Sequence, residues 1–168
     1  MIRLTHTVSA LYRLLLVAPA AGLALLIAAC GGYGGGYGAS TSTTRSSSAT
    51  ASVAVRSTGL GSILTDAQGR TVYLFARDSG ARSSCDTSCA AVWPPLTTAG
   101  AALAGNGASA GLVATTTRNG GSKQVTYNGH PLYYYVGDRN PGDTTGQNLD
   151  QFGGGWYVVS PAGAQIGN

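Results

Sequence analysis

The sequence predicts a mainly β fold, in which two related antiparallel β-hairpin units share one small core within a loop-rich chain. Apolar residues after the first third of the chain do not recur at the spacing of an amphipathic helix. Short apolar runs are instead separated by turn-forming residues, of which Asn128-Gly129 is the clearest pair. One stretch also occurs twice, because YLFARD at 73–78 returns as YYYVGD at 133–138.

Residues 1–29 are predicted to be a lipoprotein signal peptide. Arg3 and Arg13 give the segment a basic start, and an uncharged apolar run follows. The tetrapeptide IAAC at 27–30 resembles the lipobox of bacterial lipoproteins, in which the cysteine is acylated and begins the mature chain. Cys30 is therefore expected to carry palmitate-like acyl chains that anchor the protein on the extracytoplasmic side of a bacterial membrane. An ordinary signal peptide with a chance cysteine is the alternative.

The segment that follows is expected to be a disordered tether, so that residues 30–52 comprise the lipidated cysteine and a spacer. Gly, Ser and Thr dominate its sequence, GGYGGGYGASTSTTRSSSATAS. Such a segment cannot bury enough apolar surface to offset the entropy of its backbone. Residues 53–168 are then long enough for one compact β-rich domain.

The charge of the expected mature chain is small. From Cys30 onward, seven Arg and one Lys face six Asp, which leaves a net charge of +2, and the chain contains no Glu. No basic cluster interleaved with aromatic residues is present in the sequence. A nucleic-acid partner is therefore not expected.

The repeated stretch belongs to a longer repeat. Residues 62–78 form two short runs joined by a turn that ends at Gly69, and residues 123–138 repeat this pattern with the turn at Gly129. Each glycine stands four residues before the repeated tyrosine, so the repeat is a whole hairpin. Further strands are expected in other apolar runs, at 111–118 and 155–163. The glycine-rich segment 100–111 is expected to be a loop.

These features together resemble the bacterial secreted-repeat lipoproteins, a family with a Yx(F/W/Y)xxD motif. The segments that carry the resemblance are the two motif copies, CDTSCAAVWPPL, QVTYNGHPLYYYVGD and GGGWYVVSPAG. The motif residues are Tyr73, Phe75 and Asp78 in the first copy and Tyr133, Tyr135 and Asp138 in the second. The resemblance implies a lipid-anchored or secreted envelope protein, and it implies no reaction.

The doubled motif is interpreted as a strand followed by a turn. Side chains alternate along a strand, so Tyr73 and Phe75 should share one face while Leu74 points to the other. Asp78 and Asp138 lie in turn sequences, where an aspartate accepts hydrogen bonds from backbone N–H groups. Replacement of either aspartate by alanine should then cost about 1 kcal/mol of stability. A ligand or metal role for the two aspartates is the alternative.

Cys85 and Cys89 are predicted to form a structural disulfide, because two nearby cysteines outside the cytoplasm usually pair. The alternative is an extracytoplasmic metal or redox protein. In that case the two thiolates and His130 would bind a soft ion such as copper. The C-x-x-x-C spacing itself does not separate the two hypotheses.

The sequence contains no recognisable catalytic constellation, and the protein is not expected to be an enzyme. His130 is the only histidine after Cys30, and it lies beside a turn. The best hypothesis is a non-catalytic binding or structural module for a cell-wall polymer or an envelope protein, without a cofactor. A further question is whether the aromatic residues form an exposed platform or are covered. These residues are Tyr127, Tyr133, Tyr134, Tyr135, Trp156 and Tyr157.

Overall fold

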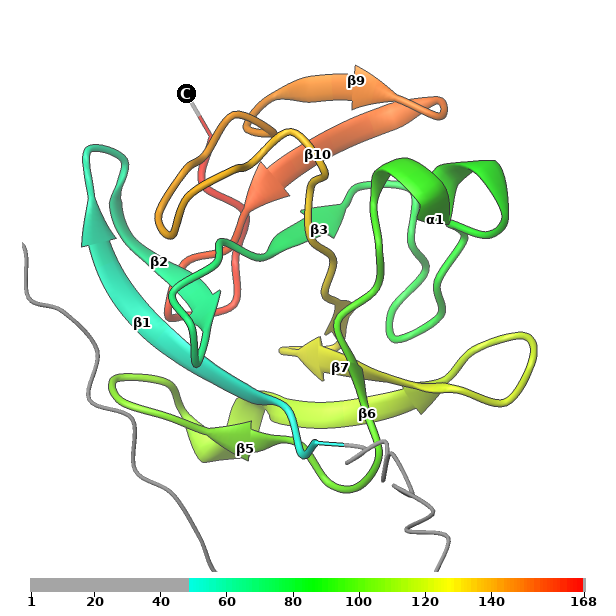
Figure 1. The fold of residues 1–168 in the computed structure, drawn as a ribbon, viewed down its shortest axis with the longest axis horizontal. Coiled ribbons are helices and arrows are strands. Elements are labelled where there is room, and N and C mark those ends of the chain that lie inside the picture. Colours follow the sequence, from blue (N-terminus) through cyan, green and yellow to red (C-terminus); the bar gives the residue numbers. More distant parts are fainter. Residues whose placement is uncertain (1–48, 168) are drawn as a thin grey trace, which may run out of the picture. The chain divides into compact units, whose positions relative to one another are not determined.

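The computed structural model describes residues 49–167, and this part of the chain is mainly β, as the sequence predicts (Figure 1). The predicted signal peptide, Cys30 and nearly all of the tether lie outside the described residues. The first strand begins at Ser52, one residue before the predicted start of the domain. No helix within residues 49–167 is long and apolar enough to cross a membrane.

The described strands form three small sheets (Figure 1). The first sheet has the order β2 (Gly61–Asp66), β1 (Ser52–Thr58), β5 (Leu103–Ala104). The second has the order β3 (Tyr73–Phe75), β10 (Gly154–Val158), β9 (Leu149–Gln151). The third has the order β4 (Thr97–Thr98), β7 (Lys123–Tyr127), β6 (Val113–Thr117), and β8 (His130–Pro131) also pairs with β7. All these pairings are antiparallel except β1 with β5.

The second predicted hairpin is present at β7 and β8, but its second strand is only two residues long, so the motif residues Tyr133 and Tyr135 lie beyond it and not in a strand. Thr126 lies opposite Pro131 and Tyr127 opposite His130. The two residues between them, Asn128 and Gly129, have φ angles of 48° and 79°. A two-residue turn with positive φ at both positions matches the right-handed twist of its strands, which is why Asn-Gly is favoured there.

The first predicted hairpin is shorter than the sequence suggests. Its turn is present, because Asp66 N donates to Arg70 O and Gly69 has a φ of 79°. Beyond this turn, however, β3 leaves β2 and pairs with β10, while β2 pairs along its length with β1. The physical reason is the aromatic side chain of Phe75, which packs against Trp156 on β10.

The remaining predictions of elements are largely met. β6 and β10 occupy the two additional predicted strand regions. The glycine-rich segment 100–111 contains the two-residue β5 and the start of a single 3₁₀ turn, η1 (Ala110–Leu112). One short helix, α1 (Ser88–Val92), begins three residues after Cys85.

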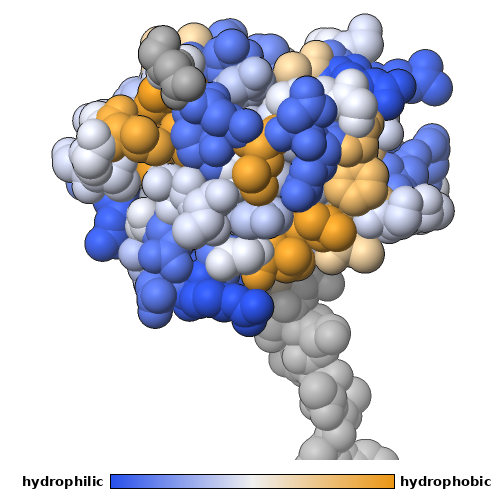
Figure 2. Space-filling view, turned by 90° about the horizontal axis from the view of Figure 1, so that it is seen from above, coloured by the Kyte–Doolittle hydropathy of each residue, from blue (hydrophilic) through white to orange (hydrophobic). Residues whose placement is uncertain are grey.

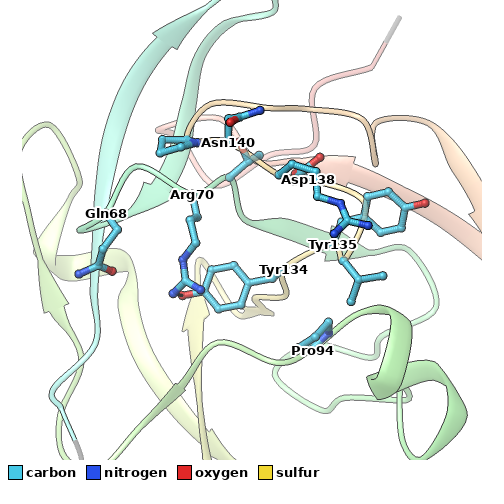
Figure 3. A pocket seen from close by; sticks show the side chains of 11 residues that line it. Gln68, Arg70, Pro94, Tyr134, Tyr135, Asp138 and Asn140 are labelled. Atoms are coloured by element: carbon cyan, nitrogen blue, oxygen red, sulfur yellow. Dashed lines mark hydrogen bonds between the residues drawn. The ribbon is translucent and has the colours of Figure 1, made fainter.

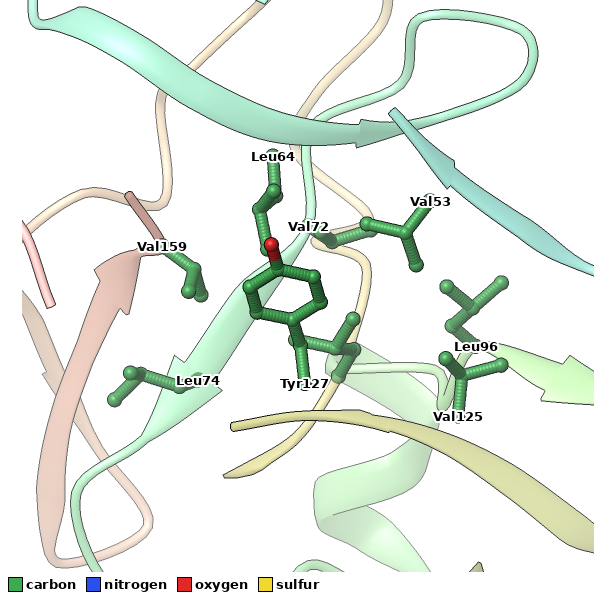
Figure 4. Packing of buried hydrophobic residues seen from close by; sticks show 9 residues of the cluster. Val53, Leu64, Val72, Leu74, Leu96, Val125, Tyr127 and Val159 are labelled. Carbon is green, nitrogen blue, oxygen red and sulfur yellow. The ribbon is translucent and has the colours of Figure 1, made fainter. Parts of the chain in front are cut away.

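Two groups of buried side chains form the core, and the repeated strand separates them. The first group is mainly aliphatic and lies between the strands of all three sheets (Figure 4): Val53, Leu64, Val72, Leu74, Leu96, Val125, Tyr127, Leu132 and Val159. The second is aromatic and includes the disulfide: Ile63, Tyr73, Phe75, Cys85, Cys89, Trp93, Tyr133, Trp156 and Val158. Leu74 thus enters one group while its neighbours Tyr73 and Phe75 enter the other, as strand alternation requires.

Candidate functional site

The two copies of the repeated motif meet in space. Tyr73 N donates to Tyr133 O over 2.8 Å, and Tyr133 N donates to Tyr73 O over 3.0 Å. The two tyrosines therefore face each other as an antiparallel bridge, sixty residues apart in the chain. Both are fully buried.

Each motif tyrosine binds the aspartate of the other copy. The Tyr73 hydroxyl donates to Asp138 Oδ2 and the Tyr133 hydroxyl donates to Asp78 Oδ2, each over 2.7 Å. We call these contacts the crossed Tyr–Asp pairs. Each pair joins the two halves of the domain, because the tyrosine of one copy takes the aspartate of the other copy as its acceptor.

The second oxygen of each aspartate fixes the loop that follows it. Asp78 Oδ1 accepts from the backbone N–H and the hydroxyl of Ser84, at 2.7 and 2.9 Å. Asp138 Oδ1 accepts from the corresponding groups of Thr145, at 2.9 and 2.6 Å. The aspartates thus bind turns, as predicted, although the donors lie six and seven residues on.

The environment keeps the motif tyrosines neutral. Burial raises the pKa of Tyr73, and the hydrogen bond to Asp138 and the charge of that carboxylate raise it further. Burial also raises the pKa of Tyr133 to well above its ordinary value. Burial raises the pKa of Asp78 as well, against the opposing effect of its hydrogen bonds from Tyr133 and Ser84. The phenols therefore serve as hydrogen-bond donors and are unsuited to act as bases.

A stack of four aromatic rings runs between the two copies. Phe75 stacks on Trp156 at 4.1 Å, and Trp156 stacks on Trp93 at 3.9 Å. Trp93 in turn stacks on Tyr135 at 4.4 Å. Of the six aromatic residues considered above, three are buried and three (Tyr134, Tyr135 and Tyr157) are half-buried, so none of them is fully exposed.

Cys85 and Cys89 form the predicted disulfide, with their Cα atoms 5.2 Å apart. Both cysteines are buried. In this pairing the two sulfurs are bonded to each other, whereas the alternative copper site needs both as free thiolates. Residues 49–167 also contain no group of three His, Cys, Asp or Glu side chains that could hold a metal ion, so His130 does not join the cysteines.

Arg118 fastens the disulfide loop to the third sheet. Its side chain is 7% exposed, and its guanidinium forms an ion pair of 2.9 Å with Asp86. It also donates to the carbonyl oxygen of Cys85 and to Gln124 Oε1. Nothing in the sequence around Arg118 signals this role, because its acceptors lie 33 residues upstream and on the neighbouring strand.

Removal of the disulfide is expected to destabilise the domain moderately. The chain-entropy model gives about 2 kcal/mol for a five-residue loop, near the low end for disulfides. Urea unfolding of a Cys85→Ala/Cys89→Ala variant would measure the loss. Reductant should destabilise the native protein by a similar amount and leave the variant unchanged. A native protein that is insensitive to reductant while it unfolds would contradict the structural role.

A pocket of about 580 Å³ lies between the first hairpin turn and the loop that follows the second motif (Figure 3). Figure 3 shows the Arg70 guanidinium beside the Tyr134 ring, with Pro94 and Tyr135 at the other side of the pocket. The lining residues are Gln68, Arg70, Thr71, Pro94, Tyr134, Tyr135, Val136, Asp138, Arg139, Asn140 and Pro141. Tyr134 and the motif residues Tyr135 and Asp138 stand out in the sequence, but nothing in it places them beside Arg70 and Arg139.

A buried aspartate organises one wall of the pocket. Asp66 is 3% exposed, and its Oδ2 accepts from Arg70 Nε at 2.7 Å and from the Tyr134 hydroxyl at 2.9 Å. The Arg70 guanidinium lies 4.1 Å from the centre of the Tyr134 ring, close enough for a cation–π contact. Asp66 Oδ1 accepts from the backbone N–H groups of the turn, at Gln68 and Arg70. The positions of Arg70 and Tyr134 are therefore fixed before any ligand arrives.

A broad apolar face is not an alternative site on the visible surface. Figure 2 shows hydrophobic side chains on one face as small, separate areas among polar ones. The large hydrophobic residues that are exposed among those described are Leu60, Leu103, Val136 and Phe152. They come from four different segments, and a pattern of single exposed hydrophobics is normal for a protein surface.

Comparison with known proteins relates this chain to one family. A family model described as a secreted repeat of unknown function matches residues 54–97 and 114–160. The two matches contain the two motif copies. No curated protein matches the chain, and no solved structure does.

Proposed function

The chain belongs to the family of secreted repeats of unknown function, and from this premise we propose that it is a non-catalytic binding module anchored by lipid in a bacterial cell envelope. A secreted repeat indicates an extracytoplasmic protein. The proposal adds two statements to this, namely that Cys30 is acylated and that the domain binds an envelope component without transforming it.

The crossed Tyr–Asp pairs are the observation that supports a non-catalytic role. The four polar side chains of the doubled motif, Tyr73, Asp78, Tyr133 and Asp138, bind one another and their own loops. Groups that are fully hydrogen-bonded within a folded core hold a structure in place. The motif thus accounts for the rigidity of the domain, and a binding role falls to the pocket beside it.

The sequence IAAC at 27–30 and the glycine- and serine-rich segment after it support the anchor. A diacylated or triacylated cysteine buries enough methylene groups for stable attachment, at about 0.8 kcal/mol for each. The following segment could then hold the domain away from the membrane surface.

Loss of the acylated cysteine is expected to release the protein from the membrane. The full chain and a Cys30→Ala variant would be expressed in a bacterium that acylates lipoproteins, with a labelled palmitate in the medium. The native chain should take up the label and sediment with membranes, whereas the variant should take up none. A Cys85→Ala/Cys89→Ala variant is the matched control and should still be labelled. Equal membrane attachment of the native chain and the Cys30 variant, without label, would overturn the anchor.

A further inference from the structure

We propose that the pocket at Arg70, Tyr135 and Arg139 binds a saccharide that carries a carboxylate. This inference rests on the proposed function, because it assigns a ligand class to the binding module. Neither the family description nor the doubled motif assigns a ligand to this place.

The pocket is held open by contacts that do not need a ligand. Its two walls are joined by a backbone hydrogen bond of 2.9 Å from Gly142 N to Gly69 O. The Arg56 side chain lies against both glycines, and its Nη1 is 2.9 Å from the point that a Cβ on Gly69 would occupy. Both glycines have positive φ, at 79° and 86°. The close approach of the turn to the loop therefore depends on residues without side chains.

Among the residues that the structure describes, Arg139 supplies the pocket with an unpaired cationic hydrogen-bond donor. The nearby carboxylates are already occupied: Asp66 by Arg70 and Tyr134, Asp138 by Tyr73 and Thr145. Arg139 is exposed, and within residues 49–167 its guanidinium has no hydrogen bond or ion pair. A guanidinium binds a carboxylate through two parallel hydrogen bonds, so a ligand rich in acceptors suits this site.

Asp143 is the third carboxylate of this region, and its hydrogen bonds hold it to its own loop. Asp143 Oδ2 accepts from the backbone N–H groups of Arg139 and Asn140, at 2.9 and 2.8 Å. These bonds lower the pKa of Asp143, so it stays ionised, but they direct the charge toward its own loop. Of the described residues, Arg139 therefore remains the unpaired cation that lines the pocket, since Arg70 is already paired with Asp66.

The apolar part of the lining suits a sugar ring. Tyr135 stacks on Trp93 with one face and lines the pocket, where it is joined by Pro94 and Val136. Flat apolar surfaces beside hydrogen-bond donors are the combination that holds the C–H face and the polar edge of a saccharide. A pocket of about 580 Å³ lies within the range of small-ligand sites.

One buried hydroxyl in the pocket wall lacks a hydrogen-bond partner. Thr71 is 2% exposed and contributes to the pocket wall. Its Oγ1 is the one buried side-chain polar atom in the described part of the chain that has no hydrogen-bond partner. Such an atom costs stability unless it is satisfied.

Titration of the full-length protein, in detergent, tests the assignment. The probes are a trimer of glucuronic acid, a glucose trimer of the same linkage, and trialanine with a free carboxylate. Because Trp93 stacks on Tyr135, tryptophan fluorescence should report occupancy. We expect saturable binding of the glucuronate trimer, weakened about tenfold or more by Arg139→Ala, as expected for a charge-assisted contact. Arg82→Ala, an exposed arginine outside this pocket, should leave binding unchanged.

The following results of the titration would overturn the assignment of the ligand. Equal affinity for the glucose trimer would remove the carboxylate from the ligand class. Binding of trialanine without the saccharide would indicate a peptide site. Absence of binding, or equal binding by the Arg139 variant with an unchanged circular-dichroism spectrum, would show that the pocket is not the site. Mass spectrometry of the recovered trimer separates this result from the proposed function, because a cleaved trimer would disprove the non-catalytic role while the ligand class stood.

Discussion

Replacement of Asp138 by alanine is expected to lower the free energy of unfolding by about 2–3 kcal/mol, which is more than the sequence alone suggests. A turn aspartate that only caps a loop is worth about 1 kcal/mol. Asp138 also accepts the hydrogen bond of the Tyr73 hydroxyl, and Tyr73 is fully buried. The variant would leave that donor without its carboxylate acceptor and out of reach of solvent. Urea unfolding would measure the difference.

A double-mutant cycle with Tyr73→Phe isolates this pair. The phenylalanine variant removes the donor, so the combination with Asp138→Ala should cost clearly less than the sum of the two single variants. Asp143→Ala is the matched control, because that aspartate binds only its own loop and is partly exposed. It should cost less than Asp138→Ala. Additive effects of Tyr73→Phe and Asp138→Ala would show that the hydrogen bond does not stabilise the fold.

Alkaline pH is expected to unfold the domain steeply. The pKa values of Tyr73 and Tyr133 are raised in the folded protein above the ordinary 10.0, first by burial. Below pH 10 both the folded and the unfolded chain keep these protons, so the stabilisation is fully present. Burial also raises the pKa of Tyr134, so as the pH rises further the unfolded chain releases three protons that the folded chain retains. Stability should then fall by about 1.4 kcal/mol per pH unit for each tyrosine, or about 4 kcal/mol for all three.

Urea unfolding at neutral pH and at about pH 11 would measure this slope, and tyrosinate absorbance would show when the phenols ionise. The Tyr73→Phe/Tyr133→Phe variant should be less stable at neutral pH but should lose much less stability between the two pH values. Ionisation of both tyrosines near pH 10 in a protein that remains folded would contradict the buried pairs.

Some turns and pairings of this fold were predictable from the sequence, and others were not. The Asn128-Gly129 turn was predictable, because the φ angles that a two-residue hairpin needs are local and few residues adopt them. The pairing of Cys85 with Cys89 was predictable for the same reason, since the partners are close in the chain. The pairing of β3 with β10 was not, because it depends on Phe75 meeting Trp156 across about eighty residues.

In the candidate site, too, the contacts between distant residues were not predictable from the sequence. The sequence singled out the aspartates of the doubled motif and assigned them to turns, and the structure places them in turns. It did not predict that each aspartate binds the tyrosine of the other copy. The pocket wall, in which Asp66 holds Arg70 beside Tyr134, was not predictable either, because Tyr134 lies 68 residues from Asp66.

The sequence by itself determined the mainly β class, the repeat and its turns, because alternation, turn chemistry and self-similarity are properties of short segments. Only the tertiary structure decided which partners the repeated residues take. The crossed pairs of Tyr73 with Asp138 and of Tyr133 with Asp78 join the two copies, as does the pocket beside them. Such contacts form between groups distant in the chain, and the free energy of burying both copies in one core selects them over the local alternatives.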